Sequence, residues 1–144
     1  MVRRAASLAD RIEEGAAGLA AFAEGLSEAE WRTPMSGSGK DRRSVGVVVH
    51  HVASVYPIEV DLARAIASGK AVTDVTWEVV ADMNAKHASD QAGVTKAAAL
   101  ELLDRAAPFS LSFAAPVTAQ FVVEDHAVRH SWHHLALIRA TLRR

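Results

Sequence analysis

Residues 44–69 read SVGVVVHHVASVYPIEVDLARAIASG and predict one long helix with an apolar side. Ser44 suits the N-cap and Gly69 the C′ position, because a serine side chain accepts from a free amide and glycine tolerates left-handed backbone. Pro57 lies inside this helix, so we expect a kink there. The apolar residues recur every three or four positions, which is the helical period: Val45, Val48, Val49, Val52, Tyr56, Leu62 and Ile66.

The rest of the chain also follows the helical period, and no segment alternates polar and apolar residues over the length of a strand. Ser27 and Glu30 form a predicted capping box before Trp31. We expect an all-α fold, a four-helix bundle with short extra helices, as a single domain over residues 1–144. The other long helices are expected at about Ser7 to Glu24, Trp77 to Gln91, after Thr95 to near Pro108, and after Thr118 to about Leu142.

The composition fits one packed domain, with 144 residues of which 50% are hydrophobic and 23% charged. Sixteen Lys and Arg balance seventeen Asp and Glu, which argues against a nucleic-acid-binding protein. The chain has no cysteine, so a disulfide scaffold, a thiolate metal site and a cysteine nucleophile are excluded. No apolar run reaches roughly 18 residues and no secretory signal is seen, so we expect a cytoplasmic protein without a membrane partner.

One short motif resembles a nucleotide site but does not meet its requirements. Residues 37–40, GSGK, match the end of a phosphate loop, G-x-x-x-x-G-K-[ST]. Pro34 stands where the first glycine is needed, Asp41 replaces the serine or threonine, and no strand precedes the loop. We therefore interpret residues 34–43 as a solvated connection.

The seven histidines are unevenly distributed along the chain. Imidazole ligates zinc, nickel, copper and iron, and positions i and i+4 lie on one face of a helix. Four histidines fall within the last predicted helix, two are adjacent in the second, and one lies in the third: His126, His130, His133 and His134; His50 and His51; His87.

Helical phase separates the histidines into inward and outward candidates. At about 100° per residue, His130 and His134 fall within the apolar arc of the last helix, while His126 and His133 lie on its flank. His51 lies roughly 85° from the middle of the apolar stripe of the second helix.

His50 lies nearly opposite that stripe, so His51 is the better inward candidate of the adjacent pair. We predict a metal site made by His51, His130 and His134. Three protein ligands leave positions open for water or substrate, as in catalytic zinc sites.

Three motifs resemble the DinB-like superfamily of metal-binding four-helix proteins, which includes mycothiol-dependent maleylpyruvate isomerase and related thiol S-transferases. They are residues 26–31, LSEAEW, followed by Pro34; residues 41–53, DRRSVGVVVHHVA; and residues 130–134, HSWHH. The resemblance covers nearly the whole chain in order and spacing.

The resemblance implies a bundle with a crossover connection and no contact with DNA. It also implies one histidine ligand from the second helix and two at i and i+4 from the last, which match His51, His130 and His134. The doubled His50–His51 departs from the family pattern and leaves open which neighbour ligates.

Two classes of function follow. The first is a metal-dependent enzyme, with zinc or nickel and a low-molecular-weight thiol, acting on a small electrophile as an S-transferase or isomerase; hydrolysis by metal-bound water is a variant. The second is a non-catalytic metal- or ligand-binding bundle used in sensing or structure. We expect a small-molecule substrate and a homodimer, and no nucleic-acid partner.

Further polar residues could reach the site. Glu59 lies on the apolar stripe of its helix, where it would either bond to a ligand histidine or extend to solvent. The basic residues near the end of the 34–43 loop would either meet an anionic ligand or remain solvated. The full set of these candidates is Glu59, Asn84, His87, Glu124, Lys40, Arg42 and Arg43.

Overall fold

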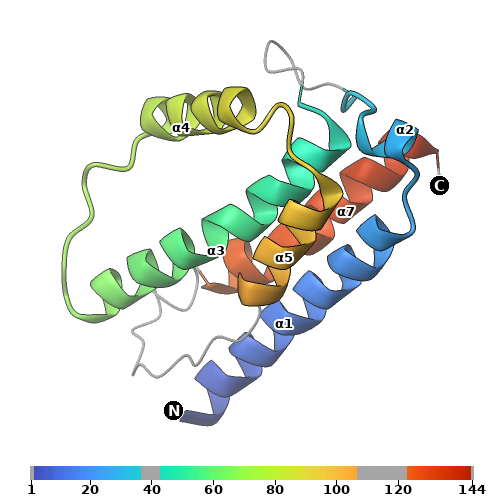
Figure 1. Cartoon of the computed structure of the whole chain (residues 1–144). Helices are drawn as coiled ribbons and strands as arrows, with labels where there is room; N and C mark the ends of the chain where they lie inside the picture. The colour runs from blue at the N-terminus through green and yellow to red at the C-terminus, as the bar shows by residue number, and fades with distance from the viewer. Residues whose placement is uncertain (1, 37–42, 107–122, 144) are drawn as a thin grey trace.

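The computed structural model describes residues 2–36, 43–106 and 123–143, and all regular elements within these ranges are helical (Figure 1). The all-α prediction is confirmed for this part of the chain. Three of the predicted features lie outside the described residues: the GSGK motif within residues 37–42, Pro108, and the start of the last predicted helix. The elements are α1 (Val2–Glu24), α2 (Glu28–Trp31), α3 (Val45–Ala67), α4 (Trp77–Asp90), α5 (Lys96–Ala106), the π-helical turn η2 (Val123–Val128) and α7 (Arg129–Leu142).

Among the described residues, the buried core lies mainly between α1, α3, α5 and α7. Both α1 and α3 pack against α5 and against α7, whereas α1 and α3 touch each other only sparsely. In Figure 1, α1 and α7 run in one direction and α3 and α5 in the other. Removing large apolar side chains from water is the main force holding these helices together. The fully buried ones include Ile12 and Leu19 of α1, Tyr56 and Val60 of α3, Leu103 of α5 and Ile138 of α7.

The caps of α3 agree with the sequence prediction. The Ser44 side chain accepts a hydrogen bond from the amide of Val47, and Gly69 adopts a φ of 84° just beyond the helix end. The helix continues across Pro57. By length and composition α3 also resembles a membrane span, but 61% of its apolar window is buried inside the fold, and core helices commonly pass this test.

The short helix α2 packs against the first turn of α3 through Trp31. Ser27 and Glu30 form the predicted capping box, and the completely buried Trp31 donates from Nε1 to the carbonyl oxygen of Val94 at 3.0 Å. The Trp31 ring covers Gly46, where an added Cβ would lie 2.3 Å from the ring. Glycine is therefore required at position 46, in the first turn of the helix that carries His51.

Gly46→Ala tests this close contact. A methyl group in a packed site with no space forces a backbone shift, so we expect a loss of about 1–3 kcal/mol in the free energy of unfolding. Urea denaturation measures the loss. Gly93→Ala is the matched control, since nothing lies within 4 Å of a Cβ there. Equal stability of the two variants would contradict the contact.

The helix α4 lies to one side of the other helices (Figure 1). Ala88 is its buried residue, while Trp77, Val79 and Met83 are exposed. Its N-cap is Thr76, whose side chain accepts from the amide of Val79. The contribution of α4 to the site is His87, near its C-terminal end.

Candidate metal centre

The structure brings together the three histidines that the sequence singles out as ligands. One ligand nitrogen from each of His51, His130 and His134 lies within 4.8 Å of the other two. The ring centroids are 5.3 Å apart for His51 and His130, 5.5 Å for His51 and His134, and 4.7 Å for His130 and His134. Bonds of about 2.1 Å in a tetrahedral zinc site place ligand atoms about 3.4 Å apart, so small side-chain rotations would complete such a site.

Direct packing of α3 against α7 produces this arrangement. His130 and His134 lie one turn apart on α7, whose buried Leu135 and Ile138 fix the facing side of the helix. Beside His130, Ser131 Oγ lies 2.7 Å from the hydroxyl oxygen of Tyr56 in a fully buried hydrogen bond between the two helices.

A glycine on α1 makes room for that hydrogen bond. A Cβ at Gly15 would lie 2.6 Å from Ser131 Oγ, so only glycine lets α1 approach α7 at this point. Ser131 is thereby held between α1 and α3, and the register of the adjacent His130 is fixed.

The burial of the histidines follows the helical phase. His51 and His130 are each 7% exposed and His134 is half-buried. His133 is exposed, and the side chain of His126 is 64% exposed. The inward residues predicted on the last helix are therefore the buried ones, and coordination of a metal by them stays a prediction.

A buried carboxylate on α3, that of Glu59, is hydrogen-bonded to two histidines of the last helical segment. Glu59 is 6% exposed, and its Oε1 accepts from Nδ1 of His126 and, at 2.9 Å, from Nδ1 of His130. Donation from Nδ1 leaves Nε2 of His130 as the free lone pair, which is how a carboxylate commonly orients a metal-binding histidine. Of the two alternatives for Glu59, the bond to a predicted ligand histidine is the one observed.

Glu59, His126 and His130 form a second group whose ligand atoms lie within 4.8 Å of one another. The shared oxygen Oε1 is already within hydrogen-bonding distance of both rings. Hydrogen bonds therefore account for this second group, and His130 links it to the first.

Burial keeps the rings of His51 and His134 neutral. Loss of solvent, followed by the charges of neighbouring histidines, lowers the pKa of His51 to about 3 and that of His134 to about 2. Burial alone would raise the pKa of the Glu59 carboxyl, but the hydrogen bonds from His126 and His130 lower it more, to below its ordinary value. At neutral pH His51 and His134 are thus neutral imidazoles, the form that binds metal, beside an ionised Glu59 carboxylate.

A third pair extends the cluster toward α4. Nδ1 of His50 and Nε2 of His87 lie 2.9 Å apart, and the His87 ring centroid is 5.4 Å from that of His51. Ring contacts therefore connect all seven histidines. Asn84 and Glu124 are half-buried and belong to neither of the ligand groups found among the described residues.

Comparison of the chain with protein-family models, with curated proteins and with solved structures finds no match. The interpretation of the site therefore rests on the geometry of this chain and on its sequence motifs.

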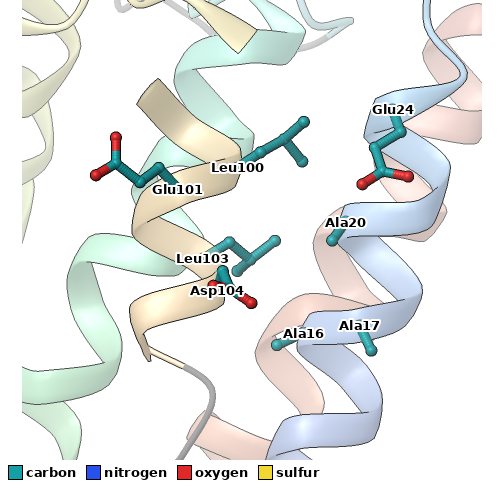
Figure 2. A pocket seen from close by; sticks show the side chains of 8 residues that line it. All are labelled: Ala16, Ala17, Ala20, Glu24, Leu100, Glu101, Leu103 and Asp104. Carbon is teal, nitrogen blue, oxygen red and sulfur yellow. The ribbon is translucent and has the colours of Figure 1, made fainter. Parts of the chain in front are cut away.

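A hollow lined by described residues lies elsewhere. It is a groove of about 360 Å³ between α1 and α5 (Figure 2). Small side chains of α1 and two leucines of α5 form its walls, with three carboxylates around them, and no imidazole lines it: Ala16, Ala17, Ala20, Glu24, Leu100, Glu101, Leu103 and Asp104. This groove is separate from the candidate metal centre.

The lowered pKa values predict how stability depends on pH. As pH falls below about 6.5, the unfolded chain protonates His51 and His134 first, so the free energy of unfolding should fall as the pH approaches their folded values near 3 and 2. Each residue adds at most about 1.4 kcal/mol per pH unit, and above about pH 6.5 this dependence disappears.

Denaturation with a chelator present, between about pH 6 and 4.5, measures the effect. His51→Gln and His134→Gln should each show a shallower loss of stability than the wild type. His133→Gln is the control: its ring is exposed and makes the smallest of the three histidine contributions to the lowered pKa of His134, so the variant should keep most of the wild-type slope. Identical slopes in all four proteins would contradict the neutral, buried state of these rings.

Proposed function

We propose that this chain is a metal-binding protein in which His51, His130 and His134 hold one divalent ion, zinc or nickel. The observation that carries the proposal is the convergence of three nitrogens from α3 and α7 within 4.8 Å. Imidazole suits both metals, and burial keeps two of the rings in the neutral, ligating form.

We also propose that the fold is a four-helix bundle with a crossover and that the chain belongs with the DinB-like proteins its motifs resemble. In support, α1 and α3 follow one another among the long helices yet lie diagonally, each packed on α5 and α7. In addition, α3 and α5 run in the same direction (Figure 1), so the segment between them, residues 68–95 with α4, must return along the bundle, as a long crossover connection does.

Within that proposal, the favoured activity is transfer or isomerisation with an external thiol. A divalent ion held by these histidines would supply Lewis acidity, which favours the thiolate form of a cosubstrate at neutral pH. The absence of cysteine fits this chemistry, because the sulfur nucleophile comes from the cosubstrate. The residues of the chain position the ligands. Glu59 orients His130 through a hydrogen bond, and His126 bonds to the same carboxylate oxygen.

Hydrolysis and a non-catalytic role in sensing or structure are the alternatives. A thiol-plus-electrophile screen of the metal-loaded protein separates them: thiol-dependent turnover supports transfer, thiol-independent turnover supports hydrolysis, and bound metal without turnover supports the non-catalytic role. A cytoplasmic location, a small-molecule substrate and a homodimer remain parts of the proposal, without nucleic-acid or membrane partners.

Metal content and thermal unfolding together test the ligand set. We expect one ion per chain in the wild type, and a stabilisation of about 2.7 kcal/mol at a free metal concentration 100 times the dissociation constant. Single alanine variants of His51, His130 and His134 should lose the ion and the stabilisation.

The matched controls are the neighbours of the ligands. His50→Ala and His133→Ala should retain the ion, since neither residue belongs to the three-nitrogen group. Loss of metal in His50→Ala with retention in His51→Ala would reverse the assignment on α3. An equal metal-induced shift in the wild type and the His130→Ala, His134→Ala double variant would refute the site.

Glu59→Gln tests the support of His130. Loss of a carboxylate that orients a ligand histidine lowers metal affinity by about 10- to 100-fold, so we expect a change of that size in the dissociation constant. Competition with a chromophoric chelator measures it. Glu101→Gln, at an exposed carboxylate paired with Arg105, is the control. Unchanged affinity in Glu59→Gln would show that Glu59 does not orient the ligand.

A further inference from the structure

The groove between α1 and α5 has an apolar floor. Ala16 and Leu103, which line it, are each 1% exposed, and the neighbouring Ala20 and Leu100 are half-buried. Its volume of about 360 Å³ lies within the range of small-molecule sites, roughly 300–1,000 Å³. None of its lining residues is basic, whereas three are acidic. The groove therefore offers an aliphatic chain an apolar surface bordered by negative charge.

Two of these carboxylates have no ionic partner among the described residues. Neither Glu24 nor Asp104 takes part in an ion pair there. Lys96 comes close to Glu24, but its Nζ donates to the carbonyl oxygens of Glu24 and Leu26 and not to the carboxylate. The charges of Glu24 and Asp104 are therefore available to a bound cation.

The third carboxylate is already paired. Glu101 forms a 2.9 Å ion pair with Arg105, and its side chain points away from α1 (Figure 2). Glu24 and Asp104 are thus the two acids that can serve a ligand lying in the groove.

Glu24 and Asp104 lie toward opposite ends of the groove. The helices α1 and α5 run in opposite directions (Figure 1). Figure 2 shows Glu24 at the upper end, beyond Ala20, and Asp104 near the level of Ala17 at the lower end. Ala17 and Glu24 are seven positions apart on α1, which is about 10 Å at the helical rise of 1.5 Å per residue. Between the two acids lie the small and leucine side chains of the floor.

We propose that this groove binds a linear aliphatic diamine, with one ammonium group at Glu24, the other at Asp104 and the methylene chain over the apolar floor between them. An ammonium group and a carboxylate form a charge-assisted hydrogen bond, and contact of the methylene groups with the floor removes apolar surface from water. Two anions at the ends of one apolar surface complement two cations joined by an apolar chain. The groove is separate from the candidate metal centre, so this proposal does not depend on the proposed function.

Three probes with the same six-carbon chain separate the charges from the apolar contact: 1,6-diaminohexane, hexylamine and 1,6-hexanediol. Each is titrated into the full chain and followed by backbone amide signals in nitrogen–proton correlation spectra. We expect the diamine to shift amides of α1 and α5 around the groove. Its dissociation constant should be about two- to fivefold below that of hexylamine, the contribution of one exposed ion pair, and the diol should bind most weakly.

Substitutions in the groove test each part of the contact. Glu24→Gln and Asp104→Asn each remove one anion, so each variant should bind 1,6-diaminohexane no more tightly than the wild type binds hexylamine. Ala17→Leu enlarges an exposed side chain that lines the groove, and it should weaken the binding of all three probes.

Two controls lie outside the contact. Glu101→Gln should keep the wild-type affinity for the diamine, because Glu101 is paired with Arg105 and points away from α1. His130→Ala should also keep it, since no histidine lines the groove, and this variant separates diamine binding from metal binding.

Three results would overturn the proposal. The first is the absence of shifts in α1 and α5 at millimolar diamine. The second is equal affinity of the wild type for the diamine and hexylamine. The third is wild-type affinity for the diamine in a folded Glu24→Gln, Asp104→Asn double variant.

Discussion

The carboxylate of Glu59 is the constraint on which the candidate centre depends. It is 6% exposed on α3 and bound to the Nδ1 atoms of His126 and His130 on the last helix. A buried charge without partners is very costly, so α3 and the last helix must pair in the register that supplies both N–H donors. The same register places His51 against His130 and His134.

The other buried polar groups of the centre lower the stability of the fold, and their presence therefore suggests a function. Several rings are buried at close range, and nitrogens of Arg43 and His87 lack hydrogen-bond partners. A packed apolar seam would be more stable than such a cluster. Local departures of this kind are typical of functional sites, where the stability is recovered by packing elsewhere. Here the compensating contacts include the enclosed Trp31 and the bond between Tyr56 and Ser131.

The sequence was sufficient for the features set by local chemistry. The caps of α3, the capping box before Trp31 and the burial of His51 and His130 follow from residue type and helical phase. The first helix begins at Val2 rather than near Ser7, because alanine and arginine, which fill most of the intervening positions, are good helix formers.

Contacts between segments far apart in the chain could not be predicted from the sequence. Pairing of His126 with Glu59 spans 67 positions, and His126 lies in a π-helical turn that an ideal α-helical phase does not describe. Pairing of His50 with His87 depends on where α4 lies, and little in its sequence fixes that, since it buries only Ala88. The sequence is equally consistent with a solvated Arg43, and only the structure shows that its Nε is buried.

X-ray absorption at the metal edge tests the central claim most directly, because it reports the ligands rather than the consequences of binding. The account predicts three imidazole nitrogens at about 2.0–2.1 Å from zinc in the wild type and two in His134→Ala reloaded at high zinc. A first shell made mainly of oxygen, or an imidazole count unchanged by His134→Ala, would contradict the three-histidine centre.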